Sequence, residues 1–104
     1  MEEKLTLIIA LWLHDTPDVE AYRAFERKAA AIMAEHGGRI ERVVRMARDP
    51  EKPHAPFEYH IVGFPDADAF AAYTNDPRTL DLAEERTTLI RHTEIVKGHD
   101  VEIP

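Results

Sequence analysis

Two ionisable side chains, Glu58 and His60, stand inside an apolar segment, residues 56–66, that has the composition of a buried strand. Residues two apart in a strand project from the same face, so the carboxylate and the imidazole are predicted to lie side by side. Burying either group costs about 1 to 3 kcal/mol for a missing hydrogen bond, and more for an unpaired charge. The pair is therefore either a hydrogen-bonded structural network or part of a functional site.

The chemistry that this pair can perform is proton transfer. His60 is the candidate general acid or base, because an imidazole changes its charge near neutral pH. Glu58 can orient that imidazole as the third group of a relay. Two structural alternatives stay open: His60 can be held at the edge of the core by Glu58, an arginine or a backbone carbonyl, and Glu58 can pair with Arg45 across a hairpin. Opposite charges facing each other on neighbouring strands are ordinary in sheets.

Arginines are concentrated just before this segment. Ten positions of an acidic protein carry four of its thirteen basic residues, at Arg39, Arg42, Arg45 and Arg48. Alternation along a strand would place Arg39 with Arg45, and Arg42 with Arg48. Arg45 is the candidate for binding an anionic substrate through two parallel hydrogen bonds. Charged side chains also protect an edge strand from unwanted pairing, and we give this explanation the greater weight.

Aromatic side chains are the candidate walls of a ligand pocket. Tyr22, Tyr73 and Trp12 are predicted to hold a small hydrophobic or aromatic ligand, although aromatic residues at helical spacing more often belong to an ordinary core. The six histidines include no His-x-His pair and no pair at helical i, i+4 spacing, so we expect no metal site. The sequence also lacks a glycine-rich phosphate loop and a dinucleotide fingerprint, so we expect no organic cofactor.

The elements that must position these residues follow from periodicity and punctuation. Apolar residues at spacings of three and four from Val19 to His36 predict an amphipathic helix, capped by Thr16 or Asp18 and ended by Gly37 at positive φ. Asp66 precedes a second helical pattern, which Asp76 caps anew before it continues to about Ile90. Strands are predicted over residues 5–13, 39–48, 57–64 and 92–101, the last with a bulge at Gly98.

The resulting order, β-α-β-β-α-β, predicts an α+β, ferredoxin-like domain, a four-stranded antiparallel sheet with two helices on one face. The first strand carries two apolar rows, with Leu7, Ile9 and Leu11 in one and Ile8, Ala10 and Trp12 in the other. Helices cover only one face, so the other row needs a second partner. The simplest partner is another copy of the chain, in a two-fold homodimer.

Composition limits the remaining possibilities. A chain of 104 residues with 44% hydrophobic residues predicts one domain, spanning residues 1–104. The net charge of -7 argues against binding to nucleic acid or to an anionic membrane surface. The longest early apolar run, Leu5–Leu13, is too short to span a membrane and has no signal-peptide cleavage site. The absence of cysteine fits a reducing cytoplasm, where we expect the protein to reside.

Short motifs along nearly the whole chain resemble an uncharacterised small-domain family of the dimeric α/β-barrel superfamily. They are His36-Gly-Gly38, Arg45, the 56–65 segment, Ala69-Phe-Ala-Ala-Tyr73 running into Asn75-Asp-Pro77, and Thr93-Glu-Ile-Val-Lys-Gly98. The resemblance implies a dimeric α/β barrel. It also implies a functional range that includes cofactor-independent quinone-forming monooxygenases, haem-degrading oxygenases, lactone isomerases, polyketide cyclases and regulatory ligand-binding domains.

One departure from the resembling oxygenases concerns their pocket. That pocket lies between helices and sheet, and its third strand carries an amide residue and a tryptophan four positions apart. By position these fall on His60 and Phe64 here, which argues against quinone-type or haem-type oxygenase chemistry. Two hypotheses result: a homodimeric, cofactor-independent enzyme (isomerase, cyclase or monooxygenase type) that uses His60 on a small aromatic or enolisable substrate, and a non-catalytic ligand-binding or assembly domain.

Overall fold

The structure, a computed structural model, describes residues 4–104. The sheet has the strand order β2-β3-β1-β4, and every neighbouring pair is antiparallel. This confirms the predicted ferredoxin-like fold, with three short helices in the place of the second helix. The elements in chain order are β1 (Leu5–Leu13), α1 (Val19–Glu35), β2 (Arg39–Arg45), β3 (Glu58–Phe64), α2 (Ala67–Asn75), α3 (Pro77–Asp81), α4 (Ala83–Leu89) and β4 (Ile90–Gly98).

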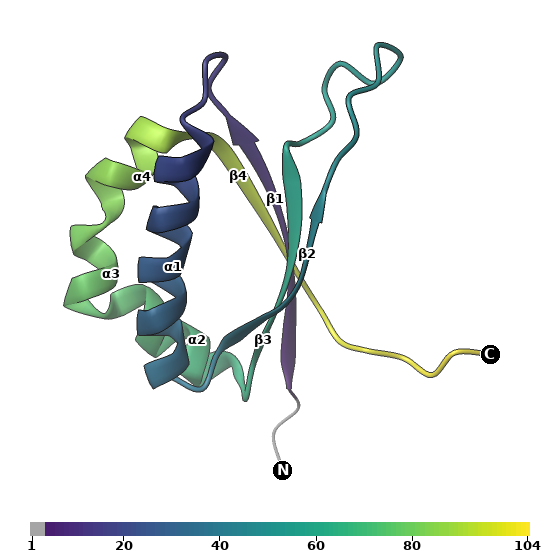
Figure 1. Ribbon diagram of the computed structural model, residues 1–104. Coiled ribbons are helices and arrows are strands. Elements are labelled where there is room, and N and C mark those ends of the chain that lie inside the picture. The colour runs from purple at the N-terminus through teal and green to yellow at the C-terminus, as the bar shows by residue number, and fades with distance from the viewer. Residues whose placement is uncertain (1–3) are drawn as a thin grey trace.

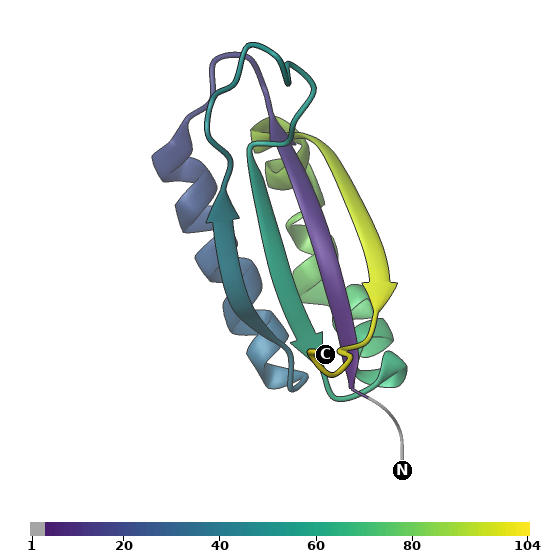
Figure 2. The same ribbon diagram turned by 90° about the vertical axis from the view of Figure 1, so that its right-hand side faces the viewer.

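The four helices of residues 4–104 all lie on one face of the sheet, which we call the inner face (Figure 1). Turning the molecule shows the opposite, outer face with no helix or strand over it in residues 4–104 (Figure 2). After β4, residues 99–104 extend away from the sheet on the outer side (Figure 1). None of the helices in the described part of the chain combines the length and apolar character needed to cross a membrane.

The ends of α1 follow from its capping residues. Asp18 is the N-cap, because its carboxylate accepts a hydrogen bond of 2.9 Å from the backbone N–H of Ala21. At the other end, Gly37 adopts φ 77°, and its N–H donates to the carbonyl of Ala34. Only glycine takes this left-handed conformation without a steric penalty from a Cβ. The predicted positive φ at Gly37 is confirmed.

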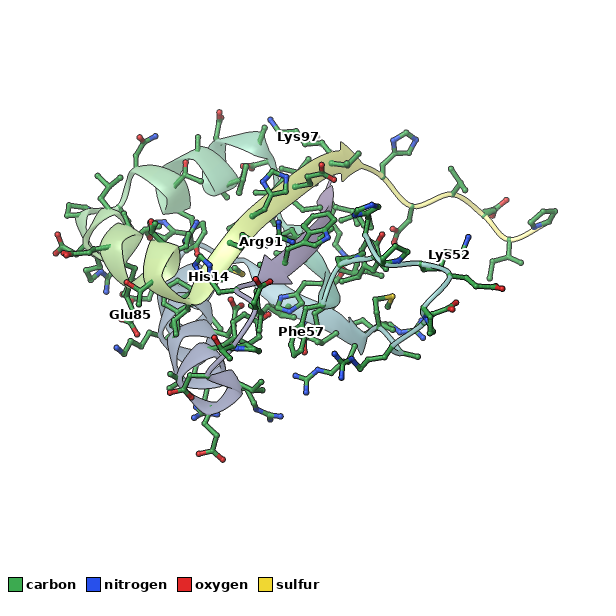
Figure 3. All side chains as sticks on the ribbon, turned by 90° about the horizontal axis from the view of Figure 1, so that it is seen from above. His14, Lys52, Phe57, Glu85, Arg91 and Lys97 are labelled. Carbon is green, nitrogen blue, oxygen red and sulfur yellow. The ribbon has the colours of Figure 1, made fainter. Side chains whose placement is uncertain are left out.

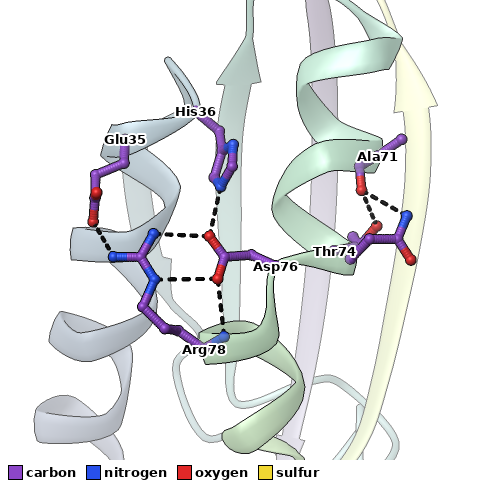
Figure 4. A network of polar contacts seen from close by, with 7 residues as sticks. Glu35, His36, Ala71, Thr74, Asp76 and Arg78 are labelled. Carbon is purple, nitrogen blue, oxygen red and sulfur yellow. Dashed lines mark hydrogen bonds and ion pairs between the residues drawn. The ribbon is translucent and has the colours of Figure 1, made fainter.

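The second helical region is anchored by Asp76, which caps α3. Its carboxylate accepts from the backbone N–H of Arg78 at 2.9 Å, from the Arg78 guanidinium at 2.8 and 3.1 Å, and contacts His36 Nε2 at 2.8 Å (Figure 4). Arg78 also donates to Glu35 at the end of α1 (Figure 4). The hydrogen bonds from Arg78, followed by the contact with His36, hold the pKa of Asp76 below its usual range. This network fixes the start of α3 against the end of α1.

Strand register differs from the predictions in three ways. The pairing of β2 with β3 skips Glu41, and the pairing of β1 with β4 skips Arg91, so these two residues are the bulges. The predicted bulge at Gly98 is wrong, since Gly98 is a regular partner of Thr6. The bulge at Glu41 also reverses the expected alternation of the arginines. Arg39 therefore shares the outer face with Arg42, and not the face of Arg45.

Three strand boundaries differ from the prediction by two or three residues. β2 ends at Arg45 instead of residue 48, and β4 begins at Ile90 instead of residue 92 and ends at Gly98 instead of residue 101. The loop between β2 and β3 leaves the sheet directly after Arg45 pairs with Glu58. Ile90, predicted as the end of the second helix, is extended and buried, because its side chain completes the core beneath α1.

The core between helices and sheet is divided into two clusters. One gathers around Leu7, Val62 and Phe64 with the end of α1, and the other around Leu11, Tyr22 and Phe25. Ile9 and Leu82 pack against both clusters. The division matters for function, because the space between the clusters is not completely filled.

Candidate functional site

Glu58 and His60 lie next to each other on the inner face of β3, as the sequence predicted, and both are about 4% exposed. Nε2 of His60 is 2.8 Å from Oε1 of Glu58, and the hydroxyl of Tyr22 donates to the same oxygen at 2.8 Å. Tyr22 Oη also lies 3.3 Å from His60 Nε2. Helix α1 thus supplies a third buried polar group to the pair on β3.

Arg45 supplies the counter-charge of this cluster. It stands opposite Glu58 in the β2–β3 register, and its Nε donates to Glu58 Oε2 at 2.9 Å with a second bond from the same guanidinium. The guanidinium also lies 4.5 Å above the ring of Phe57. This confirms the cross-strand contact that the sequence offered as one of two roles for Glu58. Because Arg45 is half exposed, the ion pair closes the outer end of the cluster.

These contacts set the protonation of the cluster. Burial alone would raise the pKa of Glu58, but the hydrogen bonds from His60, Arg45 and Tyr22 together lower it. Glu58 is therefore an anion that only accepts hydrogen bonds, so Nε2 of His60 must carry the proton between them. Burial and the neighbouring carboxylates Glu26 and Glu58 raise the pKa of Tyr22, which remains a neutral donor. With Nε2 occupied, Nδ1 of His60 is the nitrogen left for chemistry.

Nδ1 faces a carboxylate that the sequence analysis missed. Oε2 of Glu26, on α1, lies 3.6 Å from Nδ1 of His60. Burial raises the pKa of Glu26, and electrostatic interactions with His60 and Arg86 partly oppose this rise. A signal for Glu26 was present in the sequence, since it stands one helical turn after Tyr22, beside the apolar stripe of α1.

A cavity of about 350 Å³ lies between the helices and the inner face of the sheet. It occupies the gap between the two core clusters, with Leu7, Val62 and Phe64 on one side and Leu11 and Phe25 on the other. Most of its wall is apolar, and eight polar residues complete it, a mixture that is typical of a small-molecule site. The polar wall residues are Glu26, His60, Tyr73, Thr74, Thr79, Arg86, Thr87 and Thr93.

The cavity opens between α3, α4 and β4. Some of its lining residues on these elements are exposed, with Leu80 at 59% and Ile95 at 47%, whereas every lining residue on β1 and β3 is buried or half-buried. Glu26 and His60 belong to the opposite wall, formed by α1 and β3. A ligand entering at the mouth would therefore meet the Glu26–His60 pair on the inner wall.

The structure brings together most of the residues predicted from the sequence, but in two layers. His60 and Tyr73 line the cavity, while Glu58, Tyr22 and Arg45 form the layer behind His60 and do not line it. Burial raises the pKa of Tyr73, and Arg86 opposes this rise. Tyr22 and Arg45 were predicted to contact a ligand. In the structure they instead bind Glu58 within the protein.

Trp12 is not part of this arrangement. Strand alternation puts it on the outer face, paired with His92, so it cannot share a pocket with Tyr22 and Tyr73 as predicted. Its indole Nε1 donates to the carbonyl of His54 at 2.9 Å, and its ring lies 5.2 Å from that of His92. Trp12 therefore fastens the β2–β3 loop to the sheet.

A second, broader groove lies at the end of the sheet beside the β2–β3 loop. Its volume is about 910 Å³, and its walls come from the end of β1, the β2–β3 loop and the start of β4. Figure 3 looks onto this end, where His14, Phe57 and Arg91 surround the groove and Lys52 lies on the loop. The ring of Phe57 meets that of Tyr22 edge-on at 5.9 Å, so it separates this groove from the buried cluster.

No group of three or more His, Asp or Glu side chains that could hold a metal ion is found among residues 4–104. What the site offers by its own groups is an imidazole with one fixed nitrogen, a neighbouring carboxyl group and an apolar cavity beside them. Such a set can accept a proton from a bound molecule and return it.

Residues 7–99 match the family model described as a domain of unknown function, DUF1330. The chain belongs to the DUF1330 family. The comparison with curated proteins gives no match. The family assignment agrees with the resemblance to an uncharacterised small-domain family that the sequence motifs indicated.

Solved structures of similar fold extend the comparison. A protein of unknown function from Rhodopseudomonas palustris is 18% identical to this chain, with a TM-score of 0.79. The match covers 99% of this chain and 86% of that protein. SnoaB, a cofactor-independent oxygenase from Streptomyces nogalater, is 18% identical with a TM-score of 0.71, and the match covers 97% of this chain and 96% of SnoaB. A DABB family protein with a ferredoxin-like fold from Mesorhizobium loti is 14% identical with a TM-score of 0.67, and the match covers 97% of this chain and 100% of that protein. At these identities the likeness establishes the fold.

Proposed function

We propose that this DUF1330 protein binds a small aromatic or enolisable molecule in the cavity between helices and sheet, and that His60 and Glu26 transfer a proton to and from it. The observation that carries the proposal is the 3.6 Å contact between His60 Nδ1 and Glu26 Oε2 at the wall of a 350 Å³ cavity. The protein would act as a cofactor-independent enzyme of the isomerase, cyclase or monooxygenase type. The similarity in fold to SnoaB supports this class without defining the reaction.

The arrangement around the imidazole suits proton transfer. Glu58 holds Nε2–H, which fixes the tautomer and leaves the lone pair of Nδ1 on the side of Glu26. One proton can lie on the Glu26 carboxyl group or on Nδ1, so the pair can act as either acid or base. With an enolisable ketone, the pair would take a proton from the carbon next to the carbonyl, leave an enolate, and return a proton to carbon or oxygen.

We further propose that the working unit is a homodimer in the cytoplasm. The outer face carries Ile8, Tyr59 and Val96, which are 37%, 36% and 63% exposed. Ile8 is paired with both Ile61 and Val96, so the apolar side chains form a continuous row across three strands. A second copy packed against this row would bury it. The cysteine-free composition supports a reducing compartment.

The alternative function is a non-catalytic ligand-binding or assembly domain. One observation favours it: Tyr22, Glu58, His60 and Arg45 bind one another, and the His60 side chain is only 5% exposed. A cluster whose members satisfy each other can exist simply to hold the β2–β3 hairpin to α1.

Acetophenone in deuterated water tests both functions, because it is a small aromatic ketone with an enolisable methyl group. Binding is followed by NMR shifts of the cavity-lining residues, and proton transfer by the rate at which the methyl protons exchange for deuterium. Wild-type protein is expected to accelerate exchange, and His60→Gln to abolish the acceleration while acetophenone still binds. Binding without accelerated exchange would contradict catalysis and favour the alternative.

A matched pair of variants on α1 locates the binding. Ala29 lines the cavity and is 6% exposed, whereas Ala31 is exposed on the same helix. Ala29→Leu should fill part of the cavity and weaken acetophenone binding, and Ala31→Leu should leave it unchanged. If both variants bind like wild type, the ligand does not occupy this cavity and the proposed function is wrong.

A further inference from the structure

Two buried polar atoms in the cavity wall have no hydrogen-bond partner in the described part of the chain. Thr79 Oγ1 and Arg86 Nε are buried, and neither makes a hydrogen bond with any group in residues 4–104. Both residues line the cavity, and the Thr79 residue is 9% exposed. A buried polar atom without a partner costs about 1 to 3 kcal/mol, so such atoms call for an explanation. Their position suggests that a ligand supplies the missing partner.

The elements place these two side chains together. Thr79 on α3, Ala83 at the start of α4 and Arg86 on α4 follow at intervals of four and three residues, the spacing of one helical face. Leu82 joins the two helices, because its N–H donates to the carbonyl of Thr79 at 3.1 Å and its own carbonyl accepts from the N–H of Arg86 at 2.9 Å. Ala83, between them, is small and also lines the cavity, which leaves room between the hydroxyl and the guanidinium.

We propose that Arg86 and Thr79 form a carboxylate-binding subsite of this cavity, and that its ligand is a small monocarboxylic acid with an apolar or aromatic body. An arginine fork and a hydroxyl are donors of the kind that bind a carboxylate. The guanidinium carbon of Arg86 lies 5.6 Å from the centre of the Phe25 ring, a cation–π contact that helps to hold the guanidinium in position. Because burial raises the pKa of Glu26, the neighbouring carboxyl group competes less for Arg86.

The size of the cavity limits the body of the ligand. An engineered protein cavity of about 150 Å³ takes one benzene molecule. The volume of about 350 Å³ here therefore accommodates one ring and a short chain with its carboxylate. 3-Phenylpropanoate is a suitable probe, and 3-phenylpropanamide is its neutral counterpart of nearly the same shape.

This inference rests on the proposed binding function, and the two probes separate their failures. Dissociation constants of both are measured at pH 7 by calorimetry and NMR. Wild-type protein is expected to bind the carboxylate at least tenfold more tightly than the amide. Arg86→Gln should remove that preference while the amide binds as before. Thr79→Val should weaken binding of the carboxylate probe severalfold. Retained amide binding also shows that each variant is folded.

Arg23→Gln is the matched control, because Arg23 is exposed on α1 and does not line the cavity. It should leave both affinities unchanged. If wild type binds the amide in the cavity as tightly as the carboxylate, or if Arg86→Gln keeps the preference, the subsite is wrong although the cavity binds ligands. If neither probe binds, the subsite is overturned. If acetophenone also fails to bind, the proposed binding function is contradicted as well.

Discussion

The imidazole of His60 lies between two carboxylates, and their surroundings shift the pKa values of these carboxylates in opposite directions. Glu58 is an anion with three donors around it, and its pKa is lowered even though burial alone would raise it. Glu26 has no comparable set of donors, so burial raises its pKa. One nitrogen of the ring is thereby held in place, while the other faces a group that can gain or lose a proton. The two carboxylates should be distinguishable by their effects on stability.

We predict that Glu58→Gln and Glu26→Gln change stability with opposite pH dependence. The folded-state pKa of Glu58 lies below its ordinary value of 4.5, so its stabilisation is present above pH 4.5 and is lost as pH falls through the folded value. Glu58→Gln should therefore lower the free energy of unfolding by about 2 kcal/mol at pH 7, with a smaller loss near pH 3.

The folded-state pKa of Glu26 lies above 4.5, so the neutral form is favoured and stability falls as pH rises through that value. Glu26→Gln should therefore match wild type near pH 4 and exceed it at pH 8. Urea unfolding at these pH values is the measurement, with Glu51→Gln on the exposed loop as control. Parallel pH curves for the two variants would show that their environments are not opposite.

The sequence predicted the part of the site that alternation along one strand decides. Glu58 and His60 share a face because they are two residues apart, and the pairing of Glu58 with Arg45 could be offered from hairpin order. Glu26 was missed because a charged residue beside the apolar stripe of a helix is usually solvated. Arg86 was missed for the same reason, because a charged residue beside the apolar positions of a helix is usually solvated.

At the scale of elements, caps were predictable and bulges were not. Aspartate before a helix and glycine after it have local causes, so Asp18, Asp66, Asp76 and Gly37 are where the sequence places them. The bulges at Glu41 and Arg91 depend on how neighbouring strands twist and pack, and neither residue type signals one. The wrong placement of Arg39 and of the predicted bulge at Gly98 comes from this limit.

We predict that Gly37→Val lowers the free energy of unfolding by at least about 1 kcal/mol, because valine resists a positive φ. An added Cβ would also lie 2.8 Å from Cγ of Pro65. Gly98→Val is the matched control, because a Cβ there meets no atom within 4 Å. Thermal and urea unfolding of both variants give the comparison. Equal melting temperatures for Gly37→Val and wild type would mean that the C-cap of α1 tolerates a side chain.

At the scale of the whole molecule, no helix or strand of residues 4–104 covers the outer face of β1, a strand that is apolar on both faces. The sequence predicted this from the two apolar rows of Leu5–Leu13, and the structure places Ile8 between Ile61 and Val96 on that face. The tail of residues 99–104 extends on the same side (Figure 1), and it contains Val101 and Ile103, which are exposed at 79% and 94%. The row formed by Val96, Ile8 and Ile61 carries a charged side chain only at its end on β2, where Arg42 pairs with Ile61.

We predict a two-fold dimer through this face, with at least roughly 1,600 Å² buried in total. Ile8→Lys should convert the dimer to a monomer, because it would bury a charge without a partner at the centre of the apolar row. Light scattering at micromolar concentration measures the mass. Val43→Lys is the control, since Val43 is 48% exposed on the inner face of the edge strand. If dissociation exposes a core-like surface, the melting temperature of wild type should rise with protein concentration. A wild-type monomer, or a dimer that Ile8→Lys leaves intact, would place the contact elsewhere.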